Sequence, residues 1–485
     1  MSLVKTLTQG VKWTALDSTC SAIIQLVRVF ILTKLLSASD FGLMALVLIV
    51  TGFSQMFVDF GLSNAIIYKS KNSNEQLSTL YWINVMLGVF TCFIILIISY
   101  PIASFIFKEG RLNSILRIVS FTFAFNGFAV QYKALLSKKL EFRTLAQINI
   151  ITPLIGFIVT IILAYKGYGV YSLVIGYMVE NMLRGTLFIT YGIKYHKPQW
   201  YFNIKEVNSY LQFGGYQLSE RIITYFRQQG DNVLIGTFLS TETLGFYNLA
   251  KILVMKPVQL IRSVFNKMAF PVYSAIKDDK QLKFMALTVN KIVYLAIIPI
   301  MLLLIAFPDV VIYHFYGEKW MESLPYLQTL AILFSIRLFR ATFGPLLLAR
   351  GKAKQSFLFN LWFSLLVFMA LAFGLQFSIL HALYGLILME LFVFQAMNFK
   401  MILKPVLDFG AKDYLKAVLS SFLPLFFSAI ITTITYQVFS KKTSLLINLG
   451  IYLSGLCIGI ALFYILNRES VKNITTMLSK FKKEK

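Results

Sequence analysis

The chain has 485 residues, of which 58% are hydrophobic and 14% are charged. Because soluble domains are usually about 45–50% apolar and about 25% charged, this composition excludes an ordinary soluble protein. The formal net charge of +25 indicates basic loops that face anionic headgroups rather than a nucleic-acid-binding protein.

Long apolar runs predict an all-α integral membrane protein with about fourteen transmembrane helices, since about 20 mostly apolar residues cross the hydrocarbon core. The first, seventh, eighth and tenth helices carry charges and fit this pattern less well. In chain order, the predicted helices cover 10–36, 41–65, 79–104, 114–136, 146–165, 168–191, 208–238, 243–270, 286–307, 323–349, 356–377, 380–403, 415–438 and 445–466.

The loops between these helices alternate between basic and nearly uncharged. The positive-inside rule places the basic loops in the cytoplasm, and the basic tail Lys480–Lys485 on the same side as the N-terminus. Both termini are therefore expected to be cytoplasmic, which requires an even number of spans. The basic loops carry Lys69, Lys71, Lys138, Lys139, Arg143, Lys194, Lys197, Lys277, Lys280, Lys283, Arg350, Lys352, Lys354, Lys400, Lys404 and Lys412.

A shift of 203 positions superimposes two parts of the sequence. It lays Leu36 and Ser37 on Leu239 and Ser240, and Gly42 on Gly245. We therefore expect two pseudo-symmetric six-helix bundles, residues 1–205 and 206–405, followed by two extra helices and a basic cytoplasmic tail, residues 406–485. Halves with the same orientation are related by an axis along the membrane normal, as in transporters that work by alternating access.

Charged residues within the apolar helices are the candidate functional residues. A charge at the bilayer centre costs about 2.5–3.5 kcal/mol, so such residues usually face a partner or a water-filled cavity. A cationic central cavity suits an anionic cargo, and the planar fork of arginine suits phosphate. The predicted substrate-binding residues are Arg28, Arg227, Lys251, Lys256, Arg262, Arg337 and Arg340; the candidate coupling or gating carboxylates are Asp17, Asp59, Glu220 and Asp231.

Two simpler interpretations apply to these charges. They can form ion pairs within the protein, or they can reach the membrane surface along their own aliphatic stems. We assign the second interpretation to residues predicted to lie within a turn or two of a helix end, namely Lys34, Arg184, Lys267 and Arg350.

Features of soluble enzymes do not occur in the sequence. It has no Gly-rich phosphate loop followed by Lys and Ser or Thr, and its three Cys and three His lack metal-ligand spacing. The N-terminus lacks a short apolar region with a small-residue cleavage site, so no removable signal peptide is expected. We expect no catalytic residue, no cofactor and no metal.

Several segments resemble those of polysaccharide transporters in the MOP flippase superfamily, in particular the Wzx flippases that serve exopolysaccharides such as colanic acid. They are Asp40–Lys69, Leu244–Ala250, Phe270–Ile276 and Lys319–Ala331. The resemblance implies translocation of an undecaprenyl-diphosphate-linked oligosaccharide across the bacterial inner membrane, for exopolysaccharide, lipopolysaccharide or O-antigen synthesis. It further implies function as a monomer, with polysaccharide polymerase machinery as a conceivable partner.

Three alternatives remain open from the sequence. A cation-coupled drug exporter of the MATE type shares the expected fold, but its cationic cargo favours an acidic cavity. A lipid II flippase also has fourteen helices, and its segments are less similar. A membrane-embedded glycosyltransferase or polymerase would normally show a large outer loop or an acidic metal-binding motif.

Overall fold

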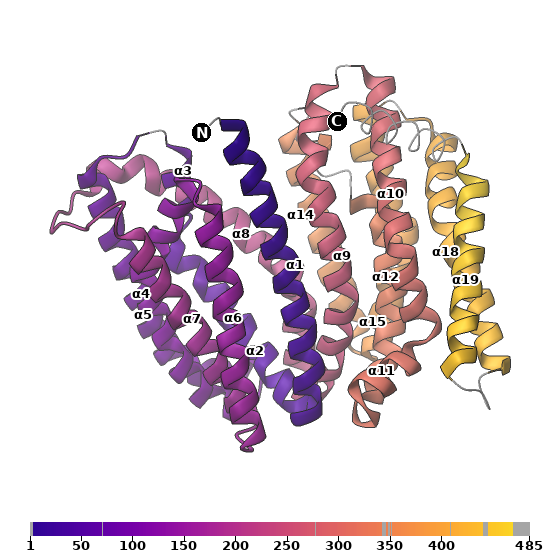
Figure 1. Cartoon of the computed structure of the whole chain (residues 1–485), viewed down its shortest axis with the longest axis horizontal. Coiled ribbons are helices and arrows are strands. Elements are labelled where there is room, and N and C mark those ends of the chain that lie inside the picture. The colour runs from indigo at the N-terminus through magenta and orange to yellow at the C-terminus, as the bar shows by residue number, and fades with distance from the viewer. Residues whose placement is uncertain are drawn as a thin grey trace. The chain divides into compact units, whose positions relative to one another are not determined.

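The computed structural model in Figure 1 describes residues 3–69, 71–276, 278–341, 346–347, 350, 352–407, 409–439 and 445–468. Within these ranges the regular structure is helical, which confirms the predicted all-α class. Ten helices in the described part are long and apolar enough to cross a membrane. The predicted count of fourteen spans stays a prediction.

The chain divides into two compact units, Met1–Asn248 and Leu249–Lys485. The boundaries expected from the repeat, at 205 and 405, describe sequence halves rather than packing units and stay predictions. The helices α7, α8, α9 and α12 are 18 residues or longer and are absent from the ten apolar spans. The seventh, eighth and tenth predicted helices, which are α8, α9 and α12, thus fit the span pattern less well, as predicted. The first qualifies but is less apolar than most of the ten, and the sixth, which is α7, is too polar to qualify.

Unit 1 contains the N-terminal helices and the start of α9. Figure 1 shows α1, α6 and α7 running alongside one another, in agreement with the α1–α6 and α6–α7 contacts. The helices are α1 (Leu3–Leu35), α2 (Ala38–Asp59), α3 (Leu62–Tyr68), α4 (Asn74–Pro101), α5 (Gly110–Lys138), α6 (Phe142–Tyr165), α7 (Val170–Gly192), α8 (Ile204–Phe238) and α9 (Thr241–Ala275), with a π-helical turn, η1 (Ile102–Ile106), after α4.

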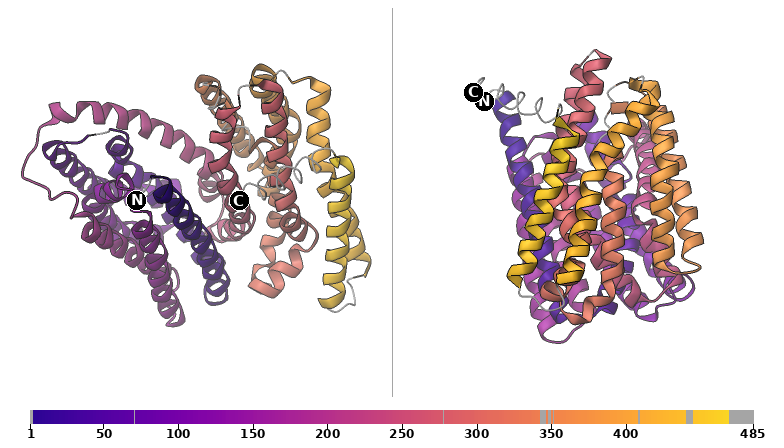
Figure 2. Two further views of the ribbon diagram at one scale, coloured as in Figure 1. Left: turned by 45° about the horizontal axis from the view of Figure 1, so that its top comes forward. Right: turned by 90° about the vertical axis from the view of Figure 1, so that its right-hand side faces the viewer.

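Unit 2 contains the remaining helices. Its last two long helices pack side by side, as the right-hand view of Figure 2 shows. The elements are α10 (Asp279–Ala306), α11 (Pro308–Tyr316), η2 (Glu318–Ser323), α12 (Leu324–Ala341), α14 (Ala353–Gly374), α15 (Ile379–Met389), η3 (Glu390–Phe394), α16 (Gln395–Asn398), η4 (Phe399–Leu403), α17 (Lys404–Leu407), α18 (Ala411–Phe439) and α19 (Leu445–Leu466).

Local sequence explains where several helices begin and end. Ser37 and Asp40 form a reciprocal capping box at the start of α2, and Asp278 caps α10. At the other end of α2, Phe60 and Gly61 both have positive φ, at 46° and 73°. This left-handed step ends the helix, so the single helix predicted over 41–65 is instead α2 followed by the short α3.

The two sequence segments that superimpose under the shift of 203 also meet in space, within unit 1. A Cβ added to Gly42 would lie 1.6 Å from the carbonyl oxygen of Thr241, and one added to Gly245 would lie 1.9 Å from that of Ala38. Each glycine thus allows the first turn of the other helix to approach closely. The contact is reciprocal, as expected where a two-fold axis relates two equivalent helices.

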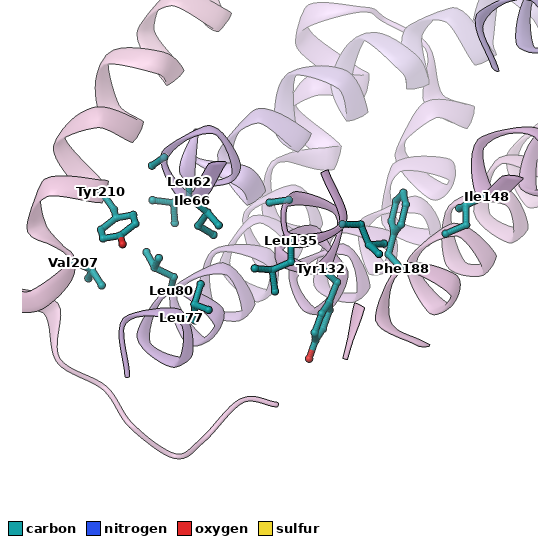
Figure 3. Close-up of a cluster of buried hydrophobic side chains, with 13 residues drawn as sticks. Leu62, Ile66, Leu77, Leu80, Tyr132, Leu135, Ile148, Phe188, Val207 and Tyr210 are labelled. Carbon is teal, nitrogen blue, oxygen red and sulfur yellow. The ribbon is translucent and has the colours of Figure 1, made fainter. Parts of the chain in front are cut away.

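A hydrophobic core holds α3, α4, α5, α6, α7 and α8 of unit 1 together at one end of the bundle. Figure 3 shows Leu62 and Ile66 of α3 near Leu80 of α4 and Tyr210 of α8. These side chains are at most a few per cent exposed. The core fixes α5 and α7, and these two helices carry charged residues farther along their length.

Candidate functional site

Two arginines share one carboxylate in the interior of unit 1. Both terminal nitrogens of Arg28 on α1 donate to Oε2 of Glu180 on α7, at 3.3 and 3.4 Å. Arg184, one turn farther along α7, donates to Oε1 of the same glutamate at 2.6 Å. The side chain of Glu180 is 12% exposed, and those of Arg28 and Arg184 are 26% and 29% exposed. The group is therefore held in place yet still accessible.

A close approach of α6 and α7 positions this glutamate. A Cβ at Gly156 would lie 2.8 Å from the Cβ of Glu180, and a Cβ at Gly176 would lie 1.9 Å from Oγ1 of Thr160. Only glycine permits this helix spacing, so the backbone beneath Glu180 is tightly constrained. Arg184 also donates from Nε to Oγ1 of Thr152 on α6, at 3.3 Å.

The contacts of Arg184 contradict the expectation that it reaches along its own stem to the membrane surface, because its guanidinium bonds to Glu180 and Thr152. At about 1.5 Å per residue, Arg184 lies about 12 Å from the end of α7, close to the predicted position. The prediction considered the distance to the helix end and no partner. The i,i+4 spacing of Arg184 from Glu180 is the signal that predicts an ion pair.

A second ion pair lies on the neighbouring helices of unit 1. Arg221 of α8 pairs with Oδ2 of Asp59, the last residue of α2. The other oxygen of Asp59 accepts from the backbone N–H of Ser63 at 3.1 Å and so caps α3. Lys133 of α5 interacts electrostatically with Asp59, Arg184 and Arg221 and thereby connects the two pairs. Arg28, Lys133, Arg184 and Arg221, with Glu180 and Asp59, are called the unit 1 charge cluster below.

Of the residues predicted from sequence, Arg28 and Asp59 belong to this cluster. Glu180 lies within a predicted helix but is not among the predicted site residues, and Arg221 and Lys133 were missed. Helical spacing in the sequence places Glu220, Arg227 and Asp231 on one face of α8, and Glu220 is exposed. One residue farther along, the helix has turned by about 100°, and this turn directs Arg221 to Asp59.

The other predicted residues of unit 1 have partners outside the cluster. Asp17 of α1 accepts from Oγ of Ser21 at 3.2 Å and from Asn149 of α6 at 3.0 Å. Arg227 and Glu220 interact electrostatically along α8. Asp231 accepts from the hydroxyl of Tyr247 at 2.6 Å, which joins α8 to the first turns of α9.

The five remaining predicted cations belong to unit 2. Lys251, Lys256 and Arg262 are on α9, and Lys251 is 7% exposed. Arg337 of α12 donates from Nε to Oε2 of Glu390 at 3.2 Å. Arg340 belongs to the same helix, but its side chain lies outside the described residues.

The loop ends of unit 1 differ in their electrostatics. At one end, Arg111 donates to both oxygens of Glu109 at 3.0 Å, and this pairing lowers the pKa of the Glu109 carboxyl. At the other end, a hydrogen bond from the Tyr195 hydroxyl lowers the pKa of Glu141, with Lys194 adding to the effect. Burial lowers the pKa of His196 there.

Unit 2 contains an apolar cavity of about 270 Å³. It lies between α10, α12 and α18, where Ile305, Leu425 and Ala429 are among its lining residues. The lining is uncharged, so this cavity and the unit 1 charge cluster differ in chemistry. Within the described part of the chain, no group of three or more His, Cys, Asp or Glu side chains is placed to hold a metal ion.

Comparison with solved structures defines the class of protein. The lipid II flippase MurJ in an inward-closed conformation superposes with a TM-score of 0.74, covering 96% of this chain and 100% of that chain. The sequence identity is 18%, so the likeness concerns the fold alone. The chain thus shares the multi-pass, all-α fold of that structure, and the predicted fold class is confirmed.

Comparison with known sequences defines the family. A family model described as a polysaccharide biosynthesis protein matches residues 31–325. The teichuronic acid biosynthesis protein TuaB of Bacillus subtilis (strain 168) is 30% identical over 358 residues, which cover 73% of this chain and 74% of TuaB. The lipopolysaccharide biosynthesis protein WzxC of Escherichia coli (strain K12) is 27% identical over 438 residues, covering 90% of this chain and 88% of WzxC. The chain belongs to the polysaccharide biosynthesis protein family, as its resemblance predicted.

Proposed function

We propose that the protein is a flippase for an undecaprenyl-diphosphate-linked oligosaccharide, which it translocates across the bacterial inner membrane for the synthesis of a surface polysaccharide. The unit 1 charge cluster is the observation that carries this proposal. It sets four cations against two carboxylates on α1, α2, α5, α7 and α8. The excess positive charge is partly exposed and suits a ligand with about two negative charges, such as a diphosphate.

The names of the relatives support a glycan cargo. TuaB and WzxC are named for the biosynthesis of teichuronic acid and lipopolysaccharide, and MurJ is named as a flippase of lipid II. A transporter is not expected to make or break covalent bonds, so we assign the chain no catalytic residue and no cofactor.

The remaining predicted cations stay candidates for contact with the diphosphate. They would neutralise its charge while the two six-helix halves alternate in access. Asp17, Asp59, Glu220 and Asp231 stay candidates for coupling to an ion gradient or for gating. The candidate cations are Arg227, Lys251, Lys256, Arg262, Arg337 and Arg340.

The proposed orientation follows from the distribution of basic residues. The end of unit 1 that carries Lys69, Lys138 and Lys194 would face the cytoplasm, together with both termini. A single cysteine replacing Lys194 should then react with a membrane-impermeant maleimide only after the inner membrane is opened. Labelling of intact spheroplasts at this position would reverse the orientation.

The test of the function is a flipping assay in proteoliposomes. The purified full-length protein is reconstituted with an undecaprenyl-diphosphate-linked oligosaccharide, and a lectin or enzyme added outside reports the lipid that reaches the outer leaflet. Arg184→Ala removes a cluster cation, and Arg143→Ala is the matched control, because Arg143 contacts the Trp13 ring near the start of α6.

We expect flipping by the wild-type protein and by Arg143→Ala, and a loss of at least about tenfold in Arg184→Ala, since hydrogen bonds to charged groups contribute about 1.5–3 kcal/mol. Absence of flipping by the wild type, together with ion-driven uptake of a small cationic dye, would contradict the proposal and favour the drug-exporter alternative.

A further inference from the structure

The two arginines that contact Glu180 differ in the length of their hydrogen bonds. Arg184 makes a short hydrogen bond of 2.6 Å to Oε1 and a second contact to Thr152. Arg28 makes only long hydrogen bonds of 3.3 and 3.4 Å, both to Oε2. The Nε of Arg28 is buried and lacks a hydrogen-bond partner among the described residues. Arg28 therefore retains donor capacity that Glu180 does not use.

The glutamate is the fixed member of this group. The close α6–α7 approach at Gly156 constrains its backbone. Arg28 belongs to a different helix, α1, and its guanidinium otherwise lies 6.0 Å from the centre of the Phe157 ring. Separation of Arg28 from Glu180 thus requires movement of one long, weakly held side chain and leaves the packing of α7 intact.

A carboxylate and a phosphate compete for the same arginine donors. A planar carboxylate and a tetrahedral phosphate each present two oxygens that can accept parallel hydrogen bonds from the guanidinium fork. Both arginines now bond to a protein carboxylate, so an incoming anion has to displace that carboxylate or share its donors. Binding of the anion then weakens the contacts of Glu180 with the arginines, and these contacts weaken binding of the anion to the same extent.

We propose that Glu180 is an internal anion that occupies the arginine pair while no substrate is bound, weakens diphosphate binding, and speeds release by returning to Arg28 and Arg184. This inference rests on the proposed function and assigns a specificity-determining role within it. Glu180 keeps the arginines neutralised in the empty protein, so that only an anion able to outcompete a carboxylate is retained. A diphosphate lipid satisfies that condition better than a monophosphate lipid.

The competing interpretation is that Glu180 is a structural ion-pair partner that merely joins α1 to α7. The two interpretations differ in the sign of one effect. If Glu180 only supports the fold of the site, its loss weakens diphosphate binding. If it competes with the ligand, its loss strengthens binding, because less of the protein is held in the self-neutralised state.

The experiment measures binding of undecaprenyl diphosphate and undecaprenyl phosphate to the full-length protein in nanodiscs, followed by flipping of the glycan-linked lipid. The variant is Glu180→Gln, which retains the size and one acceptor oxygen of the side chain, replaces the other oxygen with an NH2 donor and removes the charge. Glu141→Gln is the control, because Glu141 lies in the loop before α6 and pairs with Lys194. Folding of each variant is checked by size-exclusion chromatography.

We expect Glu180→Gln to lower the dissociation constant for undecaprenyl diphosphate by about fivefold or more, the lower range of such couplings. The rate of flipping at saturating lipid should fall, because release becomes slower, and selectivity against the monophosphate should narrow. Glu141→Gln should leave each quantity within twofold of wild type.

An unchanged or higher dissociation constant in Glu180→Gln overturns the inference while leaving the flippase proposal in place, provided that the wild type binds and flips the lipid. A wild type that binds neither lipid refutes the proposed function and the inference with it. If Glu180→Gln does not fold, Glu180→Asp decides. Its shorter side chain should loosen both arginine contacts, so tighter diphosphate binding supports the inference and weaker or equal binding overturns it.

Discussion

Each unit of the molecule places a glutamate within a membrane helix, and the two glutamates have different surroundings. Glu180 of α7 is 12% exposed and pairs with two partly exposed arginines. Glu390 begins the π-helical turn η3, has a fully buried side chain and pairs with Arg337. These helices are the sixth and twelfth predicted from the sequence. The comparison teaches that one residue type at similar positions pairs with arginines from two helices in one unit, whereas in the other it is fully buried against a single arginine that is 23% exposed.

The surroundings of Glu390 support this distinction. Tyr294 lies near Glu390, and its hydroxyl donates a hydrogen bond of 2.9 Å to the carbonyl oxygen of Ser335. One to two turns after Glu390, Gln395 and Asn398 of α16 form buried hydrogen bonds with the hydroxyl of Tyr414 on α18. A buried polar network of this kind stabilises one arrangement of helices, because each unsatisfied group would cost free energy.

The largest effect that tests the comparison is expected at Glu390. Glu390→Ala leaves the buried end of Arg337 without its carboxylate, and breaking a buried ion pair typically costs about 3–5 kcal/mol. We expect severe loss of folded protein, measured by thermal unfolding in detergent and by membrane yield. The double variant Arg337→Met with Glu390→Met should recover much of the stability. Wild-type stability in Glu390→Ala would show that the Glu390–Arg337 pair does not stabilise the fold, which would contradict the contrast drawn with Glu180.

The second effect concerns Arg221 in the accessible cluster. We expect Arg221→Ala to reduce flipping by about tenfold or more while membrane yield falls little, since the residue is 32% exposed and its partner Asp59 also caps α3. Arg221→Lys should restore only part of the activity if a bidentate contact to phosphate matters. Full recovery with lysine would leave charge alone as the requirement.

The helices that carry the two glutamates each contain a glycine shortly before the glutamate, and these two glycines differ in how closely another helix approaches them. A Cβ at Gly176 of α7 would collide with Thr160, whereas a Cβ at Gly385 of α15 has no described heavy atom within 4 Å. We expect Gly176→Ala to destabilise the protein by about 1–3 kcal/mol through overpacking. Gly385→Ala should stabilise it by about 0.5–1 kcal/mol through helix propensity. Chemical unfolding of both variants measures the difference, and equal effects would remove the packing argument for Glu180.

The smallest effect lies at the basic end of unit 1, away from both glutamates. Burial lowers the pKa of His196 below its ordinary value of 6.5. The unfolded loop takes up a proton near pH 6.5 and the folded loop resists it, so the folded state loses stability as the pH falls below 6.5 toward the lower folded value. Above pH 6.5 this residue contributes no pH dependence.

Hydrogen exchange of residues 193–203, corrected for intrinsic rates, measures this effect. We expect protection to fall by at most about tenfold per pH unit below pH 6.5, the limit for one proton. His196→Gln should abolish that slope. The same slope in wild type and variant would assign it to another group.

The sequence predicted the helical class and most helix positions because apolar runs of about 20 residues have few alternatives. It also singled out Arg28 and Asp59, which both belong to the unit 1 charge cluster, since charges deep in such runs need a partner. It missed Arg221 because the assumed face of α8 was set by Glu220, one residue and about 100° away. It could not join Arg28 to Glu180, as they are 152 positions apart and meet only through the packing of α1, α6 and α7.

The most direct test of the central claim is photo-crosslinking of the full-length protein with an undecaprenyl diphosphate analogue that carries a photoreactive group beside the phosphates. The account predicts labelled peptides from α1 and α7 around Arg28 and Glu180, with labelling reduced by excess inorganic pyrophosphate and lost in Arg184→Ala. Labelling confined to unit 2, or unaffected by pyrophosphate, would contradict the assignment of the unit 1 charge cluster as the diphosphate site.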